Sequence, residues 1–186
     1  MVLASPAPMR SIAVWLGLSA LIVVLDQITK QVVLHAIVLG QTLDVLPPVF
    51  SLVLTYNPGA AFSFLAWASG WQRYFFMAVA LAASVLIVYM MKRHERDRFL
   101  CFALALVLGG AVGNLIDRAI YGAVVDFLLL RWPGGPRLLD PWPAFNLADS
   151  CITVGAALLI WDSFLRSRVK PANVTEPLRH RDTEKN

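Results

Sequence analysis

Residues 71–91 read WQRYFFMAVALAASVLIVYMM, a run in which Arg73 is the only charged side chain. A helix crosses a bilayer core of about 30 Å with roughly 20 apolar residues, so this run is long enough to span a membrane. Three further runs with few charges occupy residues 11–34, 99–115 and 147–165. The fold class that we predict is therefore an all-α membrane protein with four transmembrane helices.

The composition agrees with a membrane location. Hydrophobic residues make up 58% of the 186-residue chain and charged residues 15%, whereas about 25% is usual in soluble domains. Four spans leave little chain for a second unit, so we predict a single transmembrane domain over residues 1–166. The polar tail at residues 167–186 lacks apolar periodicity, and we expect it to be a disordered cytoplasmic segment.

The first apolar run could be a cleaved secretory signal, because Met9-Arg10 precedes it. Such a signal ends at a small-x-small cleavage site, whereas this run continues into DQITK at residues 26–30. The pattern therefore favours a retained anchor helix.

Basic residues near the ends of spans set the orientation of a membrane protein, since they are retained on the cytoplasmic side. Most of the 16 Lys and Arg residues lie before the first run, at residues 92–98 and after the fourth run. This distribution predicts cytoplasmic termini and places residues 35–70 and 119–145 outside. The net charge of +4 then reflects topology. We predict no nucleic-acid partner, because the basic loops have few interleaved aromatic or polar side chains.

A small extracytoplasmic β element is expected between the first two helices, at about residues 40–68. Residues 49–65 read VFSLVLTYNPGAAFSFL, with polar and apolar residues alternating on both sides of Asn57-Pro58-Gly59. Alternation on both sides of such a turn sequence predicts two short strands.

Glycines at positions 109, 110 and 113 lie inside the third apolar run. Small residues at GxxxG spacing let membrane helices approach closely, so we expect these glycines to serve packing.

Nearly all charged or amide side chains of the predicted spans gather toward the outer end, although each costs about 3 kcal/mol to insert. With their neighbours in the outer segments they are Asp26, Asn57, Asn114, Asp117, Arg118, Asp126, Asn146 and Asp149. The exception is Asp162, near the inner end of the fourth span, which we expect to be solvated at the interface. Several have structural explanations. Asp26 and Lys30 have the i,i+4 spacing of a helix ion pair, which explains them as well as a functional role does. Asp117 could pair with its neighbour Arg118, and Asn146 is placed to cap the fourth helix.

Asp126 lies in VVDFLLL at residues 124–130, between apolar residues on both sides. A lone buried carboxylate costs several kcal/mol unless it is paired or neutralised. Residues 119–145 leave the third helix and return to the fourth on the same side, so Asp149 is the nearest candidate partner. Two carboxylates a few Å apart share one proton. Such a pair can activate water while it protonates the carbonyl oxygen or the leaving amine of a peptide bond.

Other hydrolytic chemistries have less support. A zinc site requires His or Cys ligands near the acids, whereas His35, His94 and His180 are scattered along the chain. Ser63 and Ser150 lack the adjacent histidine base that a serine nucleophile needs. We therefore predict no metal site.

Five segments, taken in order, resemble the signature segments of prolipoprotein signal peptidase, the bacterial signal peptidase II family. They are LDQITK (25–30), TYNPGAAFSF (55–64), GNLIDR (113–118), VVDF (124–127) and PAFNLADS (143–150). The resemblance covers about residues 10–166 and all four predicted spans. It implies an aspartyl endopeptidase of the bacterial inner membrane. Such an enzyme removes the signal peptide of a diacylglyceryl-modified prolipoprotein by cleaving before the lipidated cysteine.

The resemblance also implies roles for individual residues. The catalytic pair of the family falls on Asp126 and Asp149, the two acids paired above. The positions that order the site and hold the substrate backbone fall on Asp26, Asn57, Asn114, Arg118 and Asn146. The implied protein has no cofactor, is a monomer, and has the lipid-bearing precursor and membrane lipids as partners, with its site at the periplasmic face. The connection RWPGGPRLLDPWPAF (131–145) is longer than is usual in the family, so we expect a different outer lid.

A small proton-coupled transporter or channel subunit would also place acids inside a membrane, as relay stations. Relays need polar residues through the full membrane thickness, whereas the inner halves of the second, third and fourth predicted spans are almost purely apolar. A scaffold that binds a partner through its polar face is a third alternative. Only the peptidase would release a free signal peptide from a diacylated precursor.

Overall fold

The chain forms helices and a small sheet within residues 12–59, 70–136 and 140–168, which the computed structural model describes. In chain order the elements are α1 (Ile12–Ala36), β1 (Thr42–Leu46), β2 (Phe50–Asn57), α2 (Trp71–Arg93), α3 (Arg98–Tyr121), β3 (Val124–Leu130) and α4 (Leu147–Arg168). In this part of the chain, four helices are long and apolar enough to cross a membrane, which confirms the four predicted spans. The tail predicted to be disordered lies outside the described residues from residue 169 onward, so its disorder stays a prediction.

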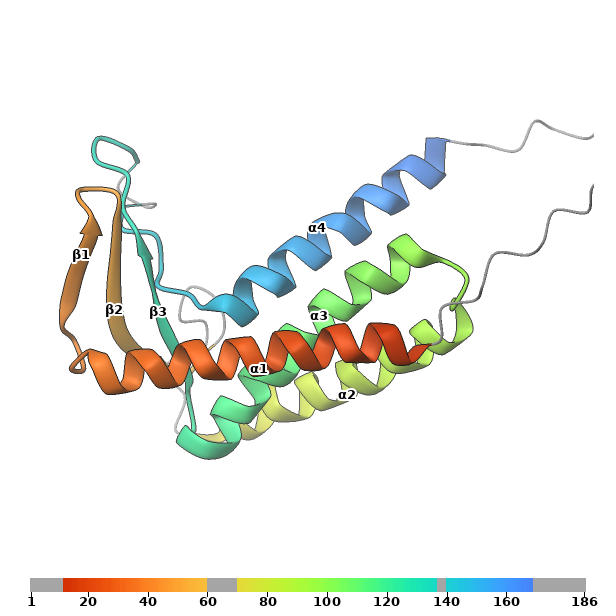
Figure 1. The fold of residues 1–186 in the computed structure, drawn as a ribbon, viewed down its shortest axis with the longest axis horizontal. Helices are drawn as coiled ribbons and strands as arrows, with labels where there is room; N and C mark the ends of the chain where they lie inside the picture. The colour runs from red at the N-terminus through yellow and green to blue at the C-terminus, as the bar shows by residue number, and fades with distance from the viewer. Residues whose placement is uncertain (1–11, 60–69, 137–139, 169–186) are drawn as a thin grey trace, which may run out of the picture.

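Helix α3 forms the centre of the bundle and packs against α1, α2 and α4. The other three helices expose most of their apolar surface, for example at Val85 of α2 and Ile160 of α4, as expected of helices that face lipid. Figure 1 shows the sheet at one end of the bundle. The turn between α2 and α3, the start of α1 and the end of α4 lie at the other end. The basic residues of 92–98 and the sheet are therefore at opposite ends of the molecule.

The glycines of α3 allow its neighbours to approach closely, as predicted. A Cβ atom on Gly109 would lie 2.7 Å from the Cβ of Ile22 on α1, and one on Gly113 would lie 2.6 Å from Oδ2 of Asp26. Gly110 faces the backbone of α4 in the same way. Larger residues at these positions would separate α3 from the helices that it holds.

The three strands form an antiparallel sheet in the order β1-β2-β3. The strand predicted before Asn57 is present as β2, and it forms a hairpin with β1 whose turn lies at residues 47–49. Proline lacks the N–H group that would continue a strand ladder, so Pro47-Pro48 suits this turn. The second strand that was expected after Gly59 falls in residues 60–69, outside the described residues.

Strand β3 is not among the elements predicted from the sequence. Its sequence lacks alternation because its first four residues are buried on both faces. Its register on β2 pairs Asn57 with Val124 and Thr55 with Asp126. An apolar cluster that includes Val33 of α1 and Val125 of β3 attaches the sheet to the end of α1. The sheet thus combines two strands from between α1 and α2 with one from between α3 and α4.

Candidate active site

Asp126 is carried by β3, and its side chain is only 1% exposed. Gly122 caps the C-terminal end of α3, and its positive φ of 79°, which favours glycine, turns the chain into β3. Pairing with β2 then places Asp126 opposite Thr55. Oδ2 of Asp126 accepts a hydrogen bond from Nδ2 of Asn57 at 3.1 Å, and Oδ1 accepts one from Nδ2 of Asn146 at 2.9 Å. The carboxyl group is therefore held by two amides from different segments.

Asp149 lies in the first turn of α4. Asn146 caps this helix, as predicted, because its Oδ1 accepts the backbone N–H of Asp149 at 2.8 Å. The backbone of Phe145 pairs with Leu128, with N···O distances of 2.8 and 3.0 Å, so the start of α4 is attached to β3. Oδ1 of Asp149 accepts a hydrogen bond from Nδ2 of Asn114 at 2.7 Å.

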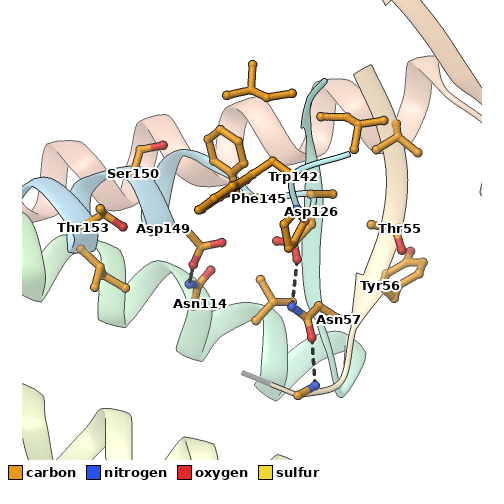
Figure 2. Close-up of a pocket in the computed structure, with 18 of the residues that line it drawn as sticks. Thr55, Tyr56, Asn57, Asn114, Asp126, Trp142, Phe145, Asp149, Ser150 and Thr153 are labelled. Carbon is orange, nitrogen blue, oxygen red and sulfur yellow. Dashed lines mark hydrogen bonds between the residues drawn. The ribbon is translucent and has the colours of Figure 1, made fainter. Parts of the chain in front are cut away.

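A chain of side-chain hydrogen bonds connects the two carboxyl groups. Nδ2 of Asn146 is 2.9 Å from Asp126 and also donates to Oδ1 of Asn114 at 3.2 Å. Asn114 in turn holds Asp149. Figure 2 shows Asp126 and Asp149 reaching the same pocket from β3 and α4, with Asn114 and Asn57 beside them. The structure thus brings together the two acids that the sequence analysis paired, and the asparagines expected to accompany them.

The environment of Asp126 favours its protonated form. Burial and, next, the neighbouring Asp149 carboxylate raise the pKa of Asp126 from 3.8 to about 7. The hydrogen bonds from Asn57 and Asn146 and the charge of Lys30 oppose this rise. Near neutral pH the Asp126 carboxyl is therefore close to half protonated, which suits a group that gives and accepts a proton.

Asp26 is fully buried and bridges α1 and α4. Its Oδ2 accepts a hydrogen bond from Nζ of Lys30 at 2.7 Å, which confirms the predicted i,i+4 ion pair. Its Oδ1 accepts the backbone N–H of Ala148 at 2.9 Å, next to Asp149 in the first turn of α4. Asp26 therefore supports the helix that carries Asp149 and does not line the cavity.

The expected pairing of Asp117 with Arg118 is wrong. Adjacent residues on a helix do not face each other. Asp117 contacts Nζ of Lys30 at 2.7 Å and accepts the backbone N–H of Val125 at 3.0 Å. Arg118 instead donates from Nη2 to the carbonyl oxygen of Gly59 at 2.9 Å, and it lines the cavity.

A cavity of about 850 Å³ lies where β2, β3, α3 and α4 meet. Its polar part is formed by Asn57, Asn114, Arg118, Asp126 and Asp149. Its apolar wall includes Val53, Leu130, Trp142, Phe145, Ile152 and Val154. Trp142 and Phe145 belong to the connection at residues 131–145, so this long connection contributes to the wall. A molecule with a polar reacting bond beside a large apolar group matches these two surfaces.

The side chains that could ligate a metal ion are those of His, Cys, Asp and Glu. Within residues 12–59, 70–136 and 140–168, no group of three or more His, Cys, Asp or Glu side chains is placed to hold a metal ion. The polar groups that the cavity offers are carboxyl, amide and guanidinium groups. They can bind a peptide backbone by hydrogen bonds and move protons.

Sequence reasoning did not identify Lys30, Asp117 and Gln27 as a group that supports the site. Nε2 of Gln27 donates to Oδ1 of Asp117 at 2.9 Å, in addition to the Lys30 contacts. A signal for this group is present in the spacing, since Asn114 and Asp117 share one face of α3. Asp26 and Lys30 likewise share one face of α1. Two apolar helices that each present polar groups on one face are expected to pair those faces.

Comparison with known proteins gives consistent matches. A family model described as Signal peptidase (SPase) II matches residues 18–165. A lipoprotein signal peptidase of Paraburkholderia phymatum is 50% identical over 161 residues, which cover 85% of this chain and 92% of that relative. Another, from Janthinobacterium sp. (strain Marseille), is 50% identical over 152 residues, which cover 82% and 88%.

Solved structures agree. A bacterial membrane enzyme determined by the in meso method at 2.3 Å resolution has a TM-score of 0.76 and 28% identity, over 90% of this chain and 98% of that chain. A second, determined at 1.9 Å resolution, has a TM-score of 0.71 and 28% identity, over 88% and 97%. The resemblance inferred from the five sequence segments is therefore confirmed. With its family model, its relatives and its fold in agreement, the chain belongs to the signal peptidase II family.

Proposed function

We propose that this chain is a lipoprotein signal peptidase of the aspartic type. It hydrolyses the peptide bond before the lipidated cysteine of a diacylglyceryl-modified prolipoprotein. The lipoprotein-processing function rests on family membership and on relatives of that name at 50% identity. The aspartic mechanism and the choice of Asp126 and Asp149 as catalytic residues rest on the geometry of the site.

The observation that carries the mechanism is the convergence of Asp126 and Asp149 on one cavity. Asn114 and Asn146 connect them, and within the described part of the chain neither carboxylate forms an ion pair. Two neighbouring carboxylates without a direct cation hold one proton between them. Burial and the Asp149 carboxylate raise the pKa of Asp126 to about 7, and in this proposal Asp126 carries the shared proton when water attacks.

In the proposed reaction, a water molecule lies between the two carboxyl groups. Asp149 accepts a proton from this water as its oxygen attacks the scissile carbonyl carbon, while Asp126 gives its proton to the carbonyl oxygen. The tetrahedral intermediate then collapses, and the C–N bond breaks as Asp149 returns a proton to the leaving amine. Asp126 recovers its proton from the hydroxyl group of the intermediate. Each group thus acts once as acid and once as base.

The two surfaces of the cavity fit this substrate. The scissile bond of a lipoprotein precursor joins an apolar signal helix to a cysteine that carries acyl chains. The apolar wall continues from Phe145 along α4 through Ile152 and Val154, where either apolar group can lie. Asn57 and Arg118, at the polar side, offer donors to the substrate backbone. Arg118 also donates to the Gly59 carbonyl, so Pro58 and Gly59 remain at the rim of the cavity.

The same proposal places the protein in the bacterial inner membrane as a monomer, with the sheet at the periplasmic side. The basic residues of 92–98 lie at the opposite end, as the positive-inside rule requires. A phosphatase that is active only in the periplasm tests this orientation. A fusion after residue 44 should be active, whereas one after residue 95 should be inactive. The reverse pattern would refute the orientation.

The decisive experiment uses the purified protein reconstituted in vesicles with a diacylglyceryl-modified precursor peptide. We expect release of the free signal peptide by the wild type and none by the Asp126→Asn and Asp149→Asn variants. Asp162→Asn is the matched control, because Asp162 is paired with Arg166 at the far end of α4. This variant should cleave the precursor normally. Cleavage by the two dyad variants at the wild-type rate would refute the aspartic mechanism. Proton flux across the vesicle without cleavage would instead favour the transporter.

A further inference from the structure

Lys30 is an unusual residue for the interior of a membrane protein, since its side chain is only 1% exposed. Its Nζ lies 2.7 Å from Oδ2 of Asp26, 2.7 Å from Oδ2 of Asp117 and 3.1 Å from Oδ1 of Asn114. An ammonium group has three donors, and these three contacts use all of them.

Each partner of Lys30 also holds a segment next to a proposed catalytic residue. The other carboxylate oxygen of Asp26 accepts the backbone N–H of Ala148, one residue before Asp149. Oδ2 of Asp117 accepts the backbone N–H of Val125, one residue before Asp126. One ammonium group therefore connects the start of α4 to the start of β3.

The third partner, Asn114, makes the most direct connection. Its Oδ1 accepts from Lys30 and from Asn146, while its Nδ2 donates to Asp149. A rotation of this amide would lose all three hydrogen bonds, so the contact with Lys30 fixes which face of Asn114 is turned to Asp149. The orientation of the amide next to the reacting group thus depends on Lys30.

Stability alone does not explain a buried charge cluster of this kind. Replacing a buried ion pair by well-packed apolar residues is often neutral or stabilising, because desolvation offsets most of the attraction between the charges. Apolar residues could pack α1 against α3, but they could not accept the N–H groups of Ala148 and Val125. The cluster therefore does something that a hydrophobic contact cannot do, which is to fix two backbone segments relative to one another.

We propose that Lys30 is a positioning residue that sets the separation of Asp126 and Asp149 and, through its charge, the pH range in which the pair is active. This inference rests on the proposed peptidase function. Lys30 contacts neither carboxylate of the pair. It acts through Asp26, Asp117 and Asn114.

The charge of Lys30 has a predictable effect on the pair. The charges that act on Asp126 are those of Asp149 on α4 and Lys30 on α1, and Asp126 in turn acts on Arg118 of α3. Asp26 of α1 and Asp117 of α3 are the carboxylates that contact Lys30. Loss of the positive charge of Lys30 disfavours the ionised carboxylates of Asp126 and Asp149. Both the acidic and the basic limb of the pH–rate profile should therefore move to higher pH. Loss of the negative charge of Asp117 should move both limbs to lower pH. A residue that only maintained the fold would lower the amount of active enzyme and leave both limbs in place.

The test measures kcat, KM and the pH–rate profile of Lys30→Gln and Asp117→Asn with the diacylated precursor peptide. For Lys30→Gln we expect kcat to fall roughly 10- to 100-fold with little change in KM, because a displacement of about 1 Å in a reacting group costs this much. We expect limb shifts of about one pH unit, upward for Lys30→Gln and downward for Asp117→Asn. Lys92→Gln and Asp162→Asn remove one charge of each sign at the opposite end of the bundle, and their profiles should match the wild type.

The outcomes separate this inference from the proposed function. If the wild type cleaves and Asp126→Asn does not, while the profiles of Lys30→Gln and Asp117→Asn overlay the wild-type profile, Lys30 has no positioning role. If the wild type does not cleave the precursor, the proposed function itself fails. Should Lys30→Gln not fold, Asp117→Asn decides: a shift to lower pH supports the inference, and unchanged limbs overturn it.

Discussion

The Asp126→Asn variant should be inactive and, above neutral pH, more stable than the wild type. The pKa of Asp126 rises from 3.8 to about 7 in the folded protein, which corresponds to about 4 kcal/mol at 1.36 kcal/mol per pKa unit. Because the folded-state pKa is raised, the wild type has this stabilising contribution in full below about pH 4. It loses the contribution progressively as the pH rises from about 4 to 7. Asparagine does not titrate, so the variant has no such loss.

The substitution also has a cost that does not depend on pH. Asn57 and Asn146 each donate an N–H to one oxygen of Asp126, whereas asparagine offers only one acceptor oxygen. One buried donor then faces the new amide nitrogen, which costs about 1–3 kcal/mol. The variant should therefore be less stable than the wild type at pH 4, where little of the Asp126 contribution is lost, and more stable by about 1–3 kcal/mol at pH 8.

Thermal unfolding in detergent micelles at pH 4 and pH 8 tests this prediction, together with a cleavage assay. We expect the order of the two melting temperatures to reverse between these pH values, and the cleavage rate of the variant to fall by at least about 10²–10⁴-fold. Asp162→Asn serves as the control, because its carboxyl lies in an exposed ion pair and its removal should give no reversal. Parallel pH dependence in the variant and the wild type would mean that Asp126 ionises freely, and the shared-proton mechanism would be wrong.

Three further predictions concern the support of the site. Asn146→Ala removes the cap of α4 and the donor to Asp126, so it should lower kcat by roughly 10²-fold and the free energy of unfolding by about 1–2 kcal/mol. Gly113→Ala would place its Cβ 2.6 Å from Oδ2 of Asp26 and should destabilise the protein by about 1–3 kcal/mol, whereas Gly17→Ala, with nothing within 4 Å, should be neutral or slightly stabilising. Cleavage in EDTA and in 1,10-phenanthroline should match the untreated rate, and a loss that added zinc restores would contradict a purely carboxylate mechanism.

The four helices are predictable from the sequence because membrane insertion is a local property. A run such as residues 71–91 is long and apolar enough to span a bilayer whatever the rest of the chain does. Strand β3 is different, since its main pairing is with residues 50–57, which are about seventy positions earlier in the chain. No local alternation marks it, because its first residues are buried on both faces. Its β-branched start, Val124-Val125, was the only local signal.

The residues of the candidate site likewise include some that the sequence predicts and some that it does not. Asp126 and Asp149 are predictable because a buried carboxylate needs a partner, and the topology leaves few partners to choose from. The partner of Asp117 is not predictable by adjacency. Each helical residue is rotated by about 100° from the next, so Asp117 faces α1 while Arg118 faces the cavity. Which polar residues meet depends on how α1 and α3 are rotated about their axes, and the close approach at their glycines sets that rotation.

Asn146 shows why a structural explanation and a functional one need not compete. As a helix cap it needs only one acceptor, and serine, threonine or aspartate could supply it. Its amide nitrogen, which the cap does not use, donates to Asp126 and to Asn114. Serine or threonine would lack this second group, and aspartate would place a third negative charge between the two carboxylates. The requirement for asparagine therefore comes from the pair of acids, while its position comes from the helix.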